Sequence, residues 1–376
     1  MRRSGIREVM DLAASRPDVL HLEVGEPNFA TPDHVLEAAA RAAVDGFTKY
    51  TENRGLASLR ETICAKLERT NGIRATPDQI VVTTGGVTAL METLIVLTDP
   101  GDGVLIPDPG WPNYEMMATV VGADVRRYPL DPANAYEPDL DRLDELATDP
   151  RAKVLIINSP ANPTGSVWRP ETMDRVVALA ARHDLWVISD EVYEEIVFEG
   201  RHLSPATIDD GGRVISVFSV SKTYAMTGWR VGYLVASEPV AALVAKVQEP
   251  VISCATAVAQ KAAEAAIGGP QECVALMRTS YRERRDLAVS ALRRDGCLAS
   301  EPHGAFYILA DVSRATRDTY ALARRLVAEH GVAVAPGETF GPAGAGLVRL
   351  SLATDPLVLA EGIRRLTGAI AQWTET

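Results

Sequence analysis

Two basic residues of different chemistry lie close together in one short segment. Lys222 ends the run Ser219-Val220-Ser221-Lys222, and Arg230 follows eight residues later in a stretch that contains glycine. A lysine amine that is partly desolvated and surrounded by cations has a lowered pKa and reacts with carbonyl groups. A guanidinium beside hydroxyl groups suits a phosphate. The pair therefore indicates a small ligand that carries an aldehyde and a phosphate, and pyridoxal phosphate (PLP) fits that description.

Taken alone, a lysine such as Lys222 is usually a solvated loop residue. The chain has six lysines among its 38 basic residues, so few amines compete for the role. Apolar runs rich in β-branched and aromatic residues, 213–220 and 231–236, flank the segment and predict two strands. The loop between them is expected near a sheet edge. Other residues must decide whether Lys222 is functional.

Strand-like apolar runs alternate with alanine-rich helical runs along most of the chain, which predicts an α/β fold: a large domain whose mostly parallel sheet is covered by helices. The expected strands are 80–84, 104–107, 154–158 and 186–190, and the expected helices are 31–44, 87–97 and 171–181. From about Tyr281 a charged helix leads into a different pattern, with an apolar run at 306–309, a helix at 320–330 and a strand at 347–352. We expect a large PLP-binding domain at 31–282, and a smaller α/β domain formed by 1–30 and 283–376.

Ligands of an open parallel sheet lie beyond the carboxyl ends of its strands, so the residues that end each run are candidates. Gly85-Gly86-Val87 follows one strand and opens a helix, which suits an anion but also a plain steric turn. Asn162 stands in a turn pattern after 154–158. Asp190 ends another strand, where a buried carboxylate needs a cationic partner or caps the next helix, and Tyr193 follows three residues later.

Arg349 alternates with apolar residues in the last expected strand. Val348, Leu350 and Leu352 fall on one face of that strand and Arg349 on the other. A guanidinium in this position either reaches solvent or forms a forked pair with a carboxylate.

In this order the motifs resemble those of the class I and II aminotransferases, in the aspartate aminotransferase superfamily of PLP fold type I. The resemblance runs from Gly25-Glu26-Pro27 to Arg349, nearly the whole chain. It implies that Lys222 binds the cofactor aldehyde and later carries a proton between the substrate Cα and the cofactor. It also implies that Asp190 pairs with the pyridine nitrogen and keeps it protonated, so that the ring accepts electrons.

The resemblance assigns the remaining site residues as well. Tyr193 and Asn162 would hydrogen-bond the ring hydroxyl, and Trp111 would stack on the ring, although core packing is its alternative role. Residues from three segments would hold the phosphate, joined by one from a second copy of the chain: Gly85, Gly86, Val87, Ser219, Ser221, Arg230 and Tyr50 of the partner subunit. Arg349, Asn162 and the backbone near Gly25 would bind the substrate α-carboxylate.

The activity implied is transfer of an amino group between an L-α-amino acid and a 2-oxo acid, with ping-pong kinetics, by a homodimer. Two alternatives stay open. A lyase that eliminates from Cβ uses the same residues, and a non-enzymatic module could sense the cofactor or another ligand. Sensors of that kind carry a basic helix-turn-helix domain ahead of this unit, and here the motifs begin by residue 25.

The substrate side chain is less constrained by the sequence. Many aspartate-specific bacterial members have a lysine where this chain has Val87, so a dicarboxylate is less favoured. We expect the side-chain pocket near Gly25, Trp111, Tyr114, 253–256 and Phe306. Which amino donor and which oxo acid it admits stays open.

Composition excludes several other classes of function. The net charge is −12 without a basic patch, which disfavours nucleic acid. No apolar run approaches the roughly 18 residues of a membrane helix, and the basic start is followed by polar residues, so a cytoplasmic protein is expected. The four cysteines and six histidines lack metal-ligand spacing. The glycine-rich segment 341–346 follows no expected strand and opens no helix, so it fails the context of a dinucleotide site and is expected to be a loop.

Overall fold

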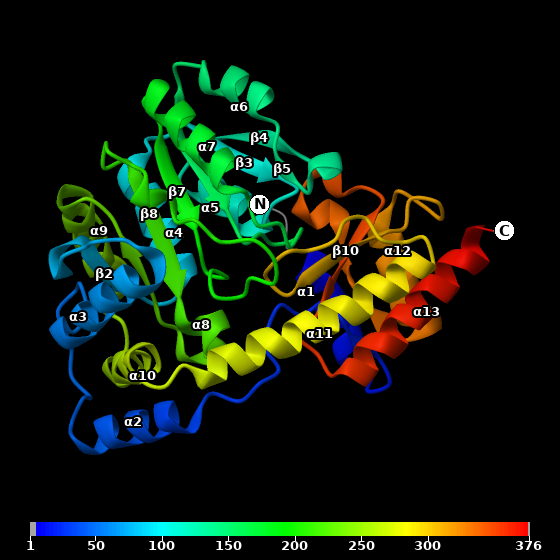
Figure 1. The fold of residues 1–376 in the computed structure, drawn as a ribbon, viewed down its shortest axis with the longest axis horizontal. Helices are drawn as coiled ribbons and strands as arrows, with labels where there is room; N and C mark the ends of the chain where they lie inside the picture. The colour runs from blue at the N-terminus through cyan, green and yellow to red at the C-terminus, as the bar shows by residue number, and fades with distance from the viewer. Residues whose placement is uncertain (1–4, 375–376) are drawn as a thin grey trace.

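The computed structural model describes residues 5–374, which form a large eight-stranded sheet and a smaller group of strands (Figure 1). In the large sheet the strand order is β2-β9-β8-β7-β6-β3-β4-β5. The strands are β2 Ile80–Thr83, β3 Gly103–Asp108, β4 Asp124–Asp131, β5 Glu137–Pro138, β6 Ala152–Asn158, β7 Trp186–Asp190, β8 Val214–Ser219 and β9 Gly232–Val235. Strands β4, β3, β6, β7 and β8 pair in parallel, whereas β9 and β5 run antiparallel to their neighbours. The expected mostly parallel sheet is confirmed.

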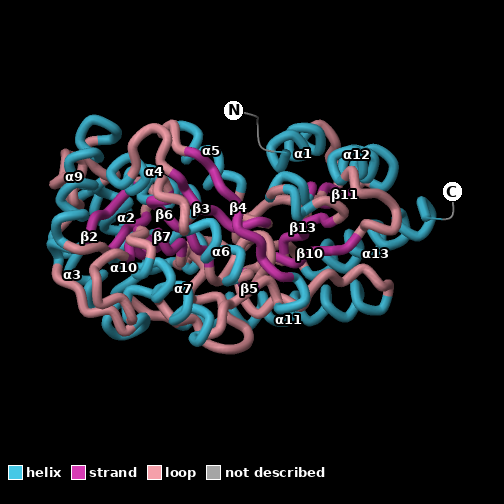
Figure 2. The backbone as a smooth tube through the Cα atoms, turned by 90° about the horizontal axis from the view of Figure 1, so that it is seen from above, coloured by secondary structure: helices cyan, strands magenta, loops and turns pink. Residues whose placement is uncertain are grey.

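The central strands are apolar on both faces because helices cover both sides. In β6, Val154 and Ile156 belong to one hydrophobic cluster, while Leu155 and Ile157 belong to another on the opposite face. This follows from the two-residue period of a strand. Figure 2 shows helices on both sides of these strands. The covering helices are α2 Asp33–Val44, α3 Ala57–Lys66, α4 Gly86–Leu97, α5 Pro112–Val120, α6 Leu140–Ala147, α7 Pro170–Arg182, α8 Val220–Thr223, α9 Glu238–Ile252 and α10 Ala257–Gly268.

The smaller group joins the two ends of the chain. Its antiparallel sheet has the order β10-β13-β12, and β1 pairs in parallel with β11. Its elements are α1 Gly5–Ala14, β1 Leu20–His21, α11 Glu272–Arg294, β10 Tyr307–Asp311, α12 Thr319–Arg325, β11 Val332–Ala333, β12 Ala335–Pro336, β13 Leu347–Ser351 and α13 Pro356–Thr374. Val9 and Leu22 share one hydrophobic cluster with Val348 and Ile363. The N-terminal segment therefore packs on the C-terminal section, as expected.

Helix α11 begins earlier than the sequence pattern suggested. It starts at Glu272, with Gln271 as its N-cap after Gly269-Pro270, and passes without interruption through the expected domain boundary at 282 (Figure 1). An acidic residue in the first turn and Arg293 and Arg294 in the last suit the helix dipole. The division into 31–282 and 1–30 with 283–376 stays a prediction.

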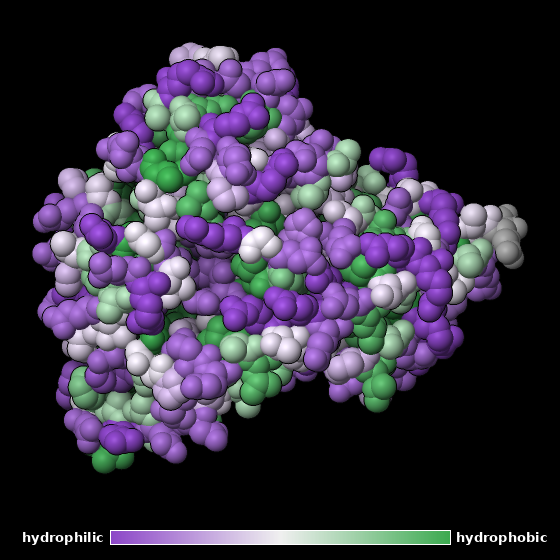
Figure 3. Space-filling model, viewed as in Figure 1, coloured by the Kyte–Doolittle hydropathy of each residue, from purple (hydrophilic) through white to green (hydrophobic). Residues whose placement is uncertain are grey.

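Short helical turns complete the described chain. They are the π-helical turns η1 Leu67–Asn71 and η6 Leu326–His330, and the 3₁₀ turns η2 Pro77–Gln79, η3 Pro132–Asn134, η4 Pro205–Thr207, η5 Thr227–Trp229, η7 Gly337–Phe340 and η8 Pro342–Gly344. The expected helix 320–330 is thus α12 continued by a π turn, and the expected loop 341–346 contains η8. On the face shown in Figure 3, hydrophilic side chains predominate and apolar ones lie scattered between them. Within residues 5–374, no helix combines the length and apolar character needed to cross a membrane.

Candidate active site

A cavity of about 610 Å³ lies where the ends of the large-sheet strands meet the smaller group. Most of the predicted site residues line it: Gly25, Gly86, Val87, Trp111, Asn162, Asp190, Tyr193, Ser219, Ser221, Lys222, Arg230 and Arg349. Residues more than 300 positions apart in the sequence therefore meet in one place.

Lys222 lies in the short helix α8, which begins directly after β8. The Ser219 side chain caps this helix by accepting a hydrogen bond from the Ser221 N–H at 3.2 Å. The Lys222 amine donates to the carbonyl oxygen of Gly25 at 2.6 Å. Burial lowers the pKa of Lys222 to about 8, and Arg349 and Arg230 act in the same direction, against Glu26 and Asp190. An amine with this pKa is partly unprotonated near neutral pH and can act as a nucleophile or base.

Asp190 ends β7 and is 3% exposed. Its Oδ2 accepts a hydrogen bond from the Tyr114 hydroxyl at 2.6 Å, and its Oδ1 accepts a longer one from the Val192 N–H at 3.4 Å. Burial raises the pKa of Asp190 to about 6, although both hydrogen bonds oppose the shift. A buried carboxylate of this kind is costly without a cation, which is what a protonated ring nitrogen would supply.

Tyr193 and Tyr307 meet across the two groups of elements. Their hydroxyl oxygens lie 2.9 Å apart, and both side chains are buried. Gly25 lies against the same hydroxyl, because a Cβ on Gly25 would come within 2.3 Å of the Tyr307 oxygen. The Gly25 backbone can therefore approach the cavity only without a side chain.

Arg349 enters the cavity from β13 and is 2% exposed. Its Nη1 donates to Asn162 Oδ1 at 3.0 Å, and its Nη2 donates to the carbonyl oxygen of Glu23. Its guanidinium carbon lies 4.4 Å from the ring centre of Tyr307 and 5.0 Å from that of Phe340. The buried Nε has no hydrogen-bond partner among the described residues. A small carboxylate is the natural partner for a buried guanidinium with a free N–H.

The other end of the cavity offers groups for an anion. Gly85 precedes α4 with φ 86°, and Arg230 also adopts a left-handed conformation, with φ 52°. A Cβ on Gly85 would lie 2.4 Å from Arg230 Nη2, so only glycine leaves room for this guanidinium. Gly86 and Val87 form the first turn of α4. The N–H groups of a helix start together with a guanidinium form an anion site.

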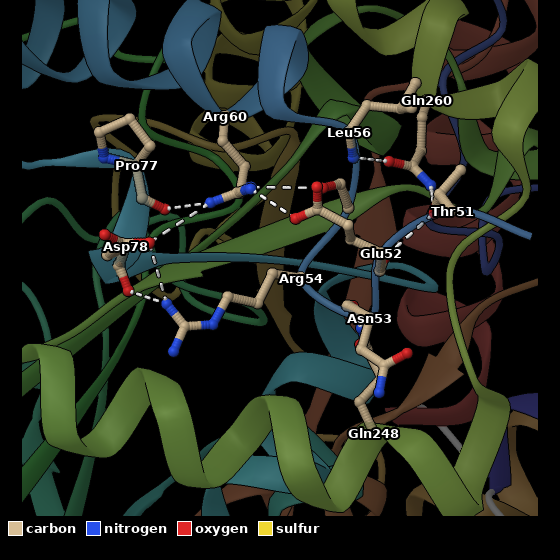
Figure 4. Close-up of polar contacts among 11 residues, drawn as sticks. Thr51, Glu52, Asn53, Arg54, Leu56, Arg60, Pro77, Asp78, Gln248 and Gln260 are labelled. Atoms are coloured by element: carbon tan, nitrogen blue, oxygen red, sulfur yellow. Dashed lines mark hydrogen bonds and ion pairs between the residues drawn. The ribbon is translucent and has the colours of Figure 1, made fainter.

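Trp111 and Tyr50 differ in how the single chain places them. Trp111 precedes α5, lines the cavity and packs edge-on against Tyr114, with ring centres 5.4 Å apart. Tyr50 is 89% exposed and does not line the cavity of its own chain. The segment that follows it is held firmly, because Gln260 donates to the Thr51 hydroxyl at 3.0 Å and Arg60 donates to the Glu52 carboxylate at 2.8 Å (Figure 4).

Sequence reasoning missed some of the cavity. Phe306 was expected in the side-chain pocket, but it is fully buried and its neighbour Tyr307 lines the cavity instead. Tyr307 begins β10, where it pairs with Ser351 of β13, and adjacent residues of an extended chain point to opposite sides. The contact of Tyr114 with Asp190 had no signal in the sequence. Residues of α1, among them Ile6 and Met10, also line the cavity.

The charges in the cavity fit PLP group by group. Lys222 offers an amine for an aldehyde, Asp190 a carboxylate for a ring nitrogen, and Arg230 with the start of α4 a site for a phosphate. Arg349 keeps a free N–H for a carboxylate. Within residues 5–374, no group of three or more His, Cys, Asp or Glu side chains could hold a metal ion.

Comparison with known proteins gives consistent matches over nearly the whole chain. The family model "Aminotransferase class I and II" matches residues 17–366. An aspartate/prephenate aminotransferase of Thermus thermophilus is 37% identical, covering 97% of this chain and 94% of that protein. The arginine–pyruvate transaminase AruH of Pseudomonas aeruginosa is 34% identical, covering 94% and 91%. The solved structure of the Thermus thermophilus aspartate aminotransferase with maleate is similar at a TM-score of 0.93 and 38% identity, covering 98% of this chain and 97% of that one.

Proposed function

The chain belongs to the class I and II aminotransferases, and on that premise we propose which residues perform the transfer. It is a PLP-dependent aminotransferase of fold type I, which exchanges an amino group between amino acids and 2-oxo acids. The relatives are named as transaminases, and no observation favours the Cβ elimination that the site residues alone leave open.

The position of Lys222 carries the proposal. Lys222 is partly buried, its amine has a pKa of about 8, and it lies in the same cavity as Asp190, Arg230 and Arg349. We assign to Lys222 the bond to the cofactor aldehyde, and afterwards the removal and return of the proton at the substrate Cα. When bound, PLP supplies an electron sink for the charge that forms at that carbon.

The other side chains bind and orient. Asp190, fixed by Tyr114, holds the pyridine nitrogen, and Tyr193 with Asn162 holds the ring hydroxyl. Trp111 covers the ring. We assign the phosphate to the cavity residues Gly86, Val87, Ser219, Ser221 and Arg230, together with Gly85, which lies against Arg230. Arg349 takes the substrate α-carboxylate through a fork, with Asn162 and the Gly25 backbone beside it.

A homodimer whose subunits share residues of each site accounts for the exposed position of Tyr50, outside the cavity of its own chain. An aromatic side chain that is 89% exposed at the start of a firmly held segment suits an interface. A second cavity, lined by Trp229, Arg230 and Thr256, shares Arg230 with the active-site cavity. We assign this second cavity to a residue of the other copy, Tyr50 of the partner subunit, which then reaches the phosphate.

The smaller group of elements is proposed to be the domain that closes over the substrate, with 1–30 and 283–376 as its parts and 31–282 as the PLP-binding domain. Support comes from the origin of the cavity walls, because Gly25 and Arg349 belong to the smaller group and Lys222 and Asp190 to the larger.

A cytoplasmic location is also proposed. The four cysteines are all free thiols, which suits the reducing conditions of the cytoplasm.

The amino donor is proposed to carry an apolar or aromatic side chain. Apolar side chains form much of the remaining wall, including Ile6, Met10 and Val24. Among the described lining residues, Arg7 is the one cation without an assigned role, and it is exposed. Relatives named for aspartate, prephenate and arginine occur at 34–37% identity. Initial rates with phenylalanine, leucine, aspartate and arginine, each with several oxo acids, test this assignment.

The experiment that tests the catalytic assignment replaces Lys222. Lys222→Ala should lower transamination by ~10³-fold or more and leave no covalent cofactor adduct after borohydride reduction, measured by mass spectrometry. Lys153→Ala is the matched control, because Lys153 is exposed in β6 and should keep both signals. A Lys222→Ala protein that transaminates at the wild-type rate would refute the assignment.

A further inference from the structure

The turn that follows β7 presents side chains to two opposite environments. Asp190 and Tyr193 line the cavity. Glu191 stands between these two residues and Glu194 follows Tyr193, and neither glutamate lines the cavity. Both are nevertheless shielded from solvent: Glu191 is fully buried, and the Glu194 side chain is only 7% exposed. Two buried carboxylates behind a cofactor site need partners, since an unpaired buried charge is strongly destabilising.

Glu194 is held by two residues of one helical segment. The Lys66 amine donates to one carboxylate oxygen, and the Asn71 amide donates to the other. Lys66 also donates to Asn71 Oδ1 at 2.9 Å, so the three side chains form a closed network. The Lys66 side chain is 4% exposed. This ion pair is therefore buried on both sides.

The backbone that carries these partners is unusual. Lys66 ends α3, and Asn71 ends the π-helical turn η1. The wider turn brings residues five apart to the same carboxylate. Single π turns are rare and occur frequently at functional sites.

The same network touches the strand that leads to Lys222. The Lys66 amine lies 4.8 Å from the centre of the Phe218 ring, and Phe218 stands in β8 four residues before Lys222. One buried cation thus contacts both chain segments that enter the cavity, the turn with Tyr193 and the end of β8.

Glu191 has a separate set of partners. Its carboxylate contacts His202 Nε2 at 2.7 Å and accepts a hydrogen bond from the Ser204 hydroxyl at 3.0 Å. Its N–H donates to the carbonyl of Val217 in β8 at 2.9 Å. The turn is therefore fixed at Glu191 as well as at Glu194.

A buried ion pair is a poor device for stability alone. Replacing such a pair by well-packed apolar residues of similar volume is often neutral or stabilising, whereas removing one partner is costly. Charged groups with directed hydrogen bonds do, however, fix the orientation of the segments that carry them. Side chains that act on a cofactor need their supports fixed in this way.

We propose that Glu194, bound by Lys66 and Asn71, is a positioning residue that fixes the turn from behind, so that Tyr193 and Asp190 keep the orientation needed to bind PLP. This inference rests on the proposed function, because Tyr193 and Asp190 are assigned there to the cofactor. Glu191 with His202 supports the same turn at its other end.

Two variants of the pair test the inference. Glu194→Gln keeps the shape and removes the charge, and the double variant Lys66→Met with Glu194→Leu replaces the pair by apolar side chains. In both, PLP affinity of the cofactor-free protein should fall about tenfold, and the pH midpoint of the bound cofactor's visible absorbance should shift by about 0.5 unit. The double variant should keep a melting temperature near that of the wild type. If Glu194→Gln does not fold, the double variant alone decides.

Glu137→Gln is the matched control. Glu137, in β5, is 4% exposed, accepts hydrogen bonds from Arg169 and Thr172 at the start of α7, and does not line the active-site cavity. It should lower the melting temperature and leave PLP affinity and the absorbance midpoint unchanged. If the double variant also keeps wild-type affinity and midpoint, the pair is merely structural and the inference fails. A wild-type protein that binds no PLP would instead refute the proposed function, and the inference with it.

Discussion

Two arginines that line the cavity, Arg349 and Arg230, show two ways to place a positive charge. Arg349 is 2% exposed, lies against the rings of Tyr307 and Phe340, and donates a hydrogen bond to Asn162. Arg230 is exposed, its Nη1 donates to the carbonyl of Thr227 at 2.8 Å, and it lies against Gly85. We call these the buried side and the open side of the cavity.

The two guanidinium groups differ in how far they are desolvated before a ligand binds. On the buried side the protein has already desolvated and oriented the guanidinium, and burial lowers the pKa of Arg349 accordingly. A carboxylate that arrives there meets a strong, weakly screened field. On the open side water and salt screen Arg230 until a ligand or a second chain covers it. Substitutions on the buried side should therefore have the larger effects.

Arg349→Lys should have the largest effect. Lysine cannot form the fork, and a shorter cation would leave Asn162 Oδ1 and the Glu23 carbonyl without their donor. The expected loss in kcat/KM for amino donors is ~10³-fold, about 4 kcal/mol. Arg364→Lys, at an exposed arginine of α13, is the control and should have no effect. A loss below tenfold would show that the α-carboxylate binds elsewhere.

The free energy of unfolding should depend on pH through Asp190, because burying its carboxylate disfavours the charged form. Its pKa is about 6 in the folded, cofactor-free chain, above the ordinary value of 3.8. Between pH 4 and 6 the unfolded chain therefore loses this proton first, so the contribution of Asp190 to stability falls as pH rises and then levels off. The full change is about 3 kcal/mol at most.

Urea unfolding of the cofactor-free wild type and of Asp190→Asn, at pH steps from 4 to 7, measures this change. The asparagine variant cannot ionise, so wild type minus variant isolates the carboxylate. The free energy of unfolding of the wild type minus that of the variant should fall as the pH rises from 4 to 6. A constant difference would mean that Asp190 is not desolvated, and the contrast between the two sides would be weakened.

Arg230→Gln tests the open side and should have a smaller effect. Loss of one charge-assisted contact to a phosphate lowers PLP affinity by ~10–30-fold, about 2 kcal/mol. Because Arg230 is exposed, the wild-type affinity should fall with added salt, and the variant should show a weaker salt dependence. KM for the amino donor should stay unchanged. An equal salt dependence in both proteins would contradict the role of Arg230 as the exposed phosphate ligand.

The fold and the outline of the site could be predicted because they depend on local patterns. The runs that end at Asp190 and Asn158 are strands, and the glycines after Thr84 open a helix, as the spacing indicated. Contacts between distant segments could not be predicted. Glu194 looks in the sequence like any surface glutamate, and its burial depends on a π turn at Lys66 and on packing against β8.

Tyr307 was hidden for a related reason. Tyr307 and Phe306 are adjacent and both aromatic, so the residue types alone do not show which of them faces the cavity; in the fold it is Tyr307. The Tyr114 hydroxyl of α5 donates to Asp190 at the end of β7, a contact between residues 76 positions apart. Helical spacing within α5 contains no such information.

Tyr307→Phe should have the smallest effect. It separates the contribution of the Tyr307 hydroxyl from that of its ring, which lies against Arg349. The substitution removes the hydroxyl that meets Tyr193 at 2.9 Å and keeps the ring that lies 4.4 Å from the Arg349 guanidinium. If ring packing orients Arg349, amino-donor KM stays within about twofold, and only the loss of one buried hydrogen bond, about 1 kcal/mol, appears in unfolding. Tyr307→Leu is the companion variant, because it removes the ring as well and should raise KM. Equal KM values for the two variants would mean that the ring does not orient Arg349, so that its bonds to Asn162 and the Glu23 carbonyl hold the guanidinium without it.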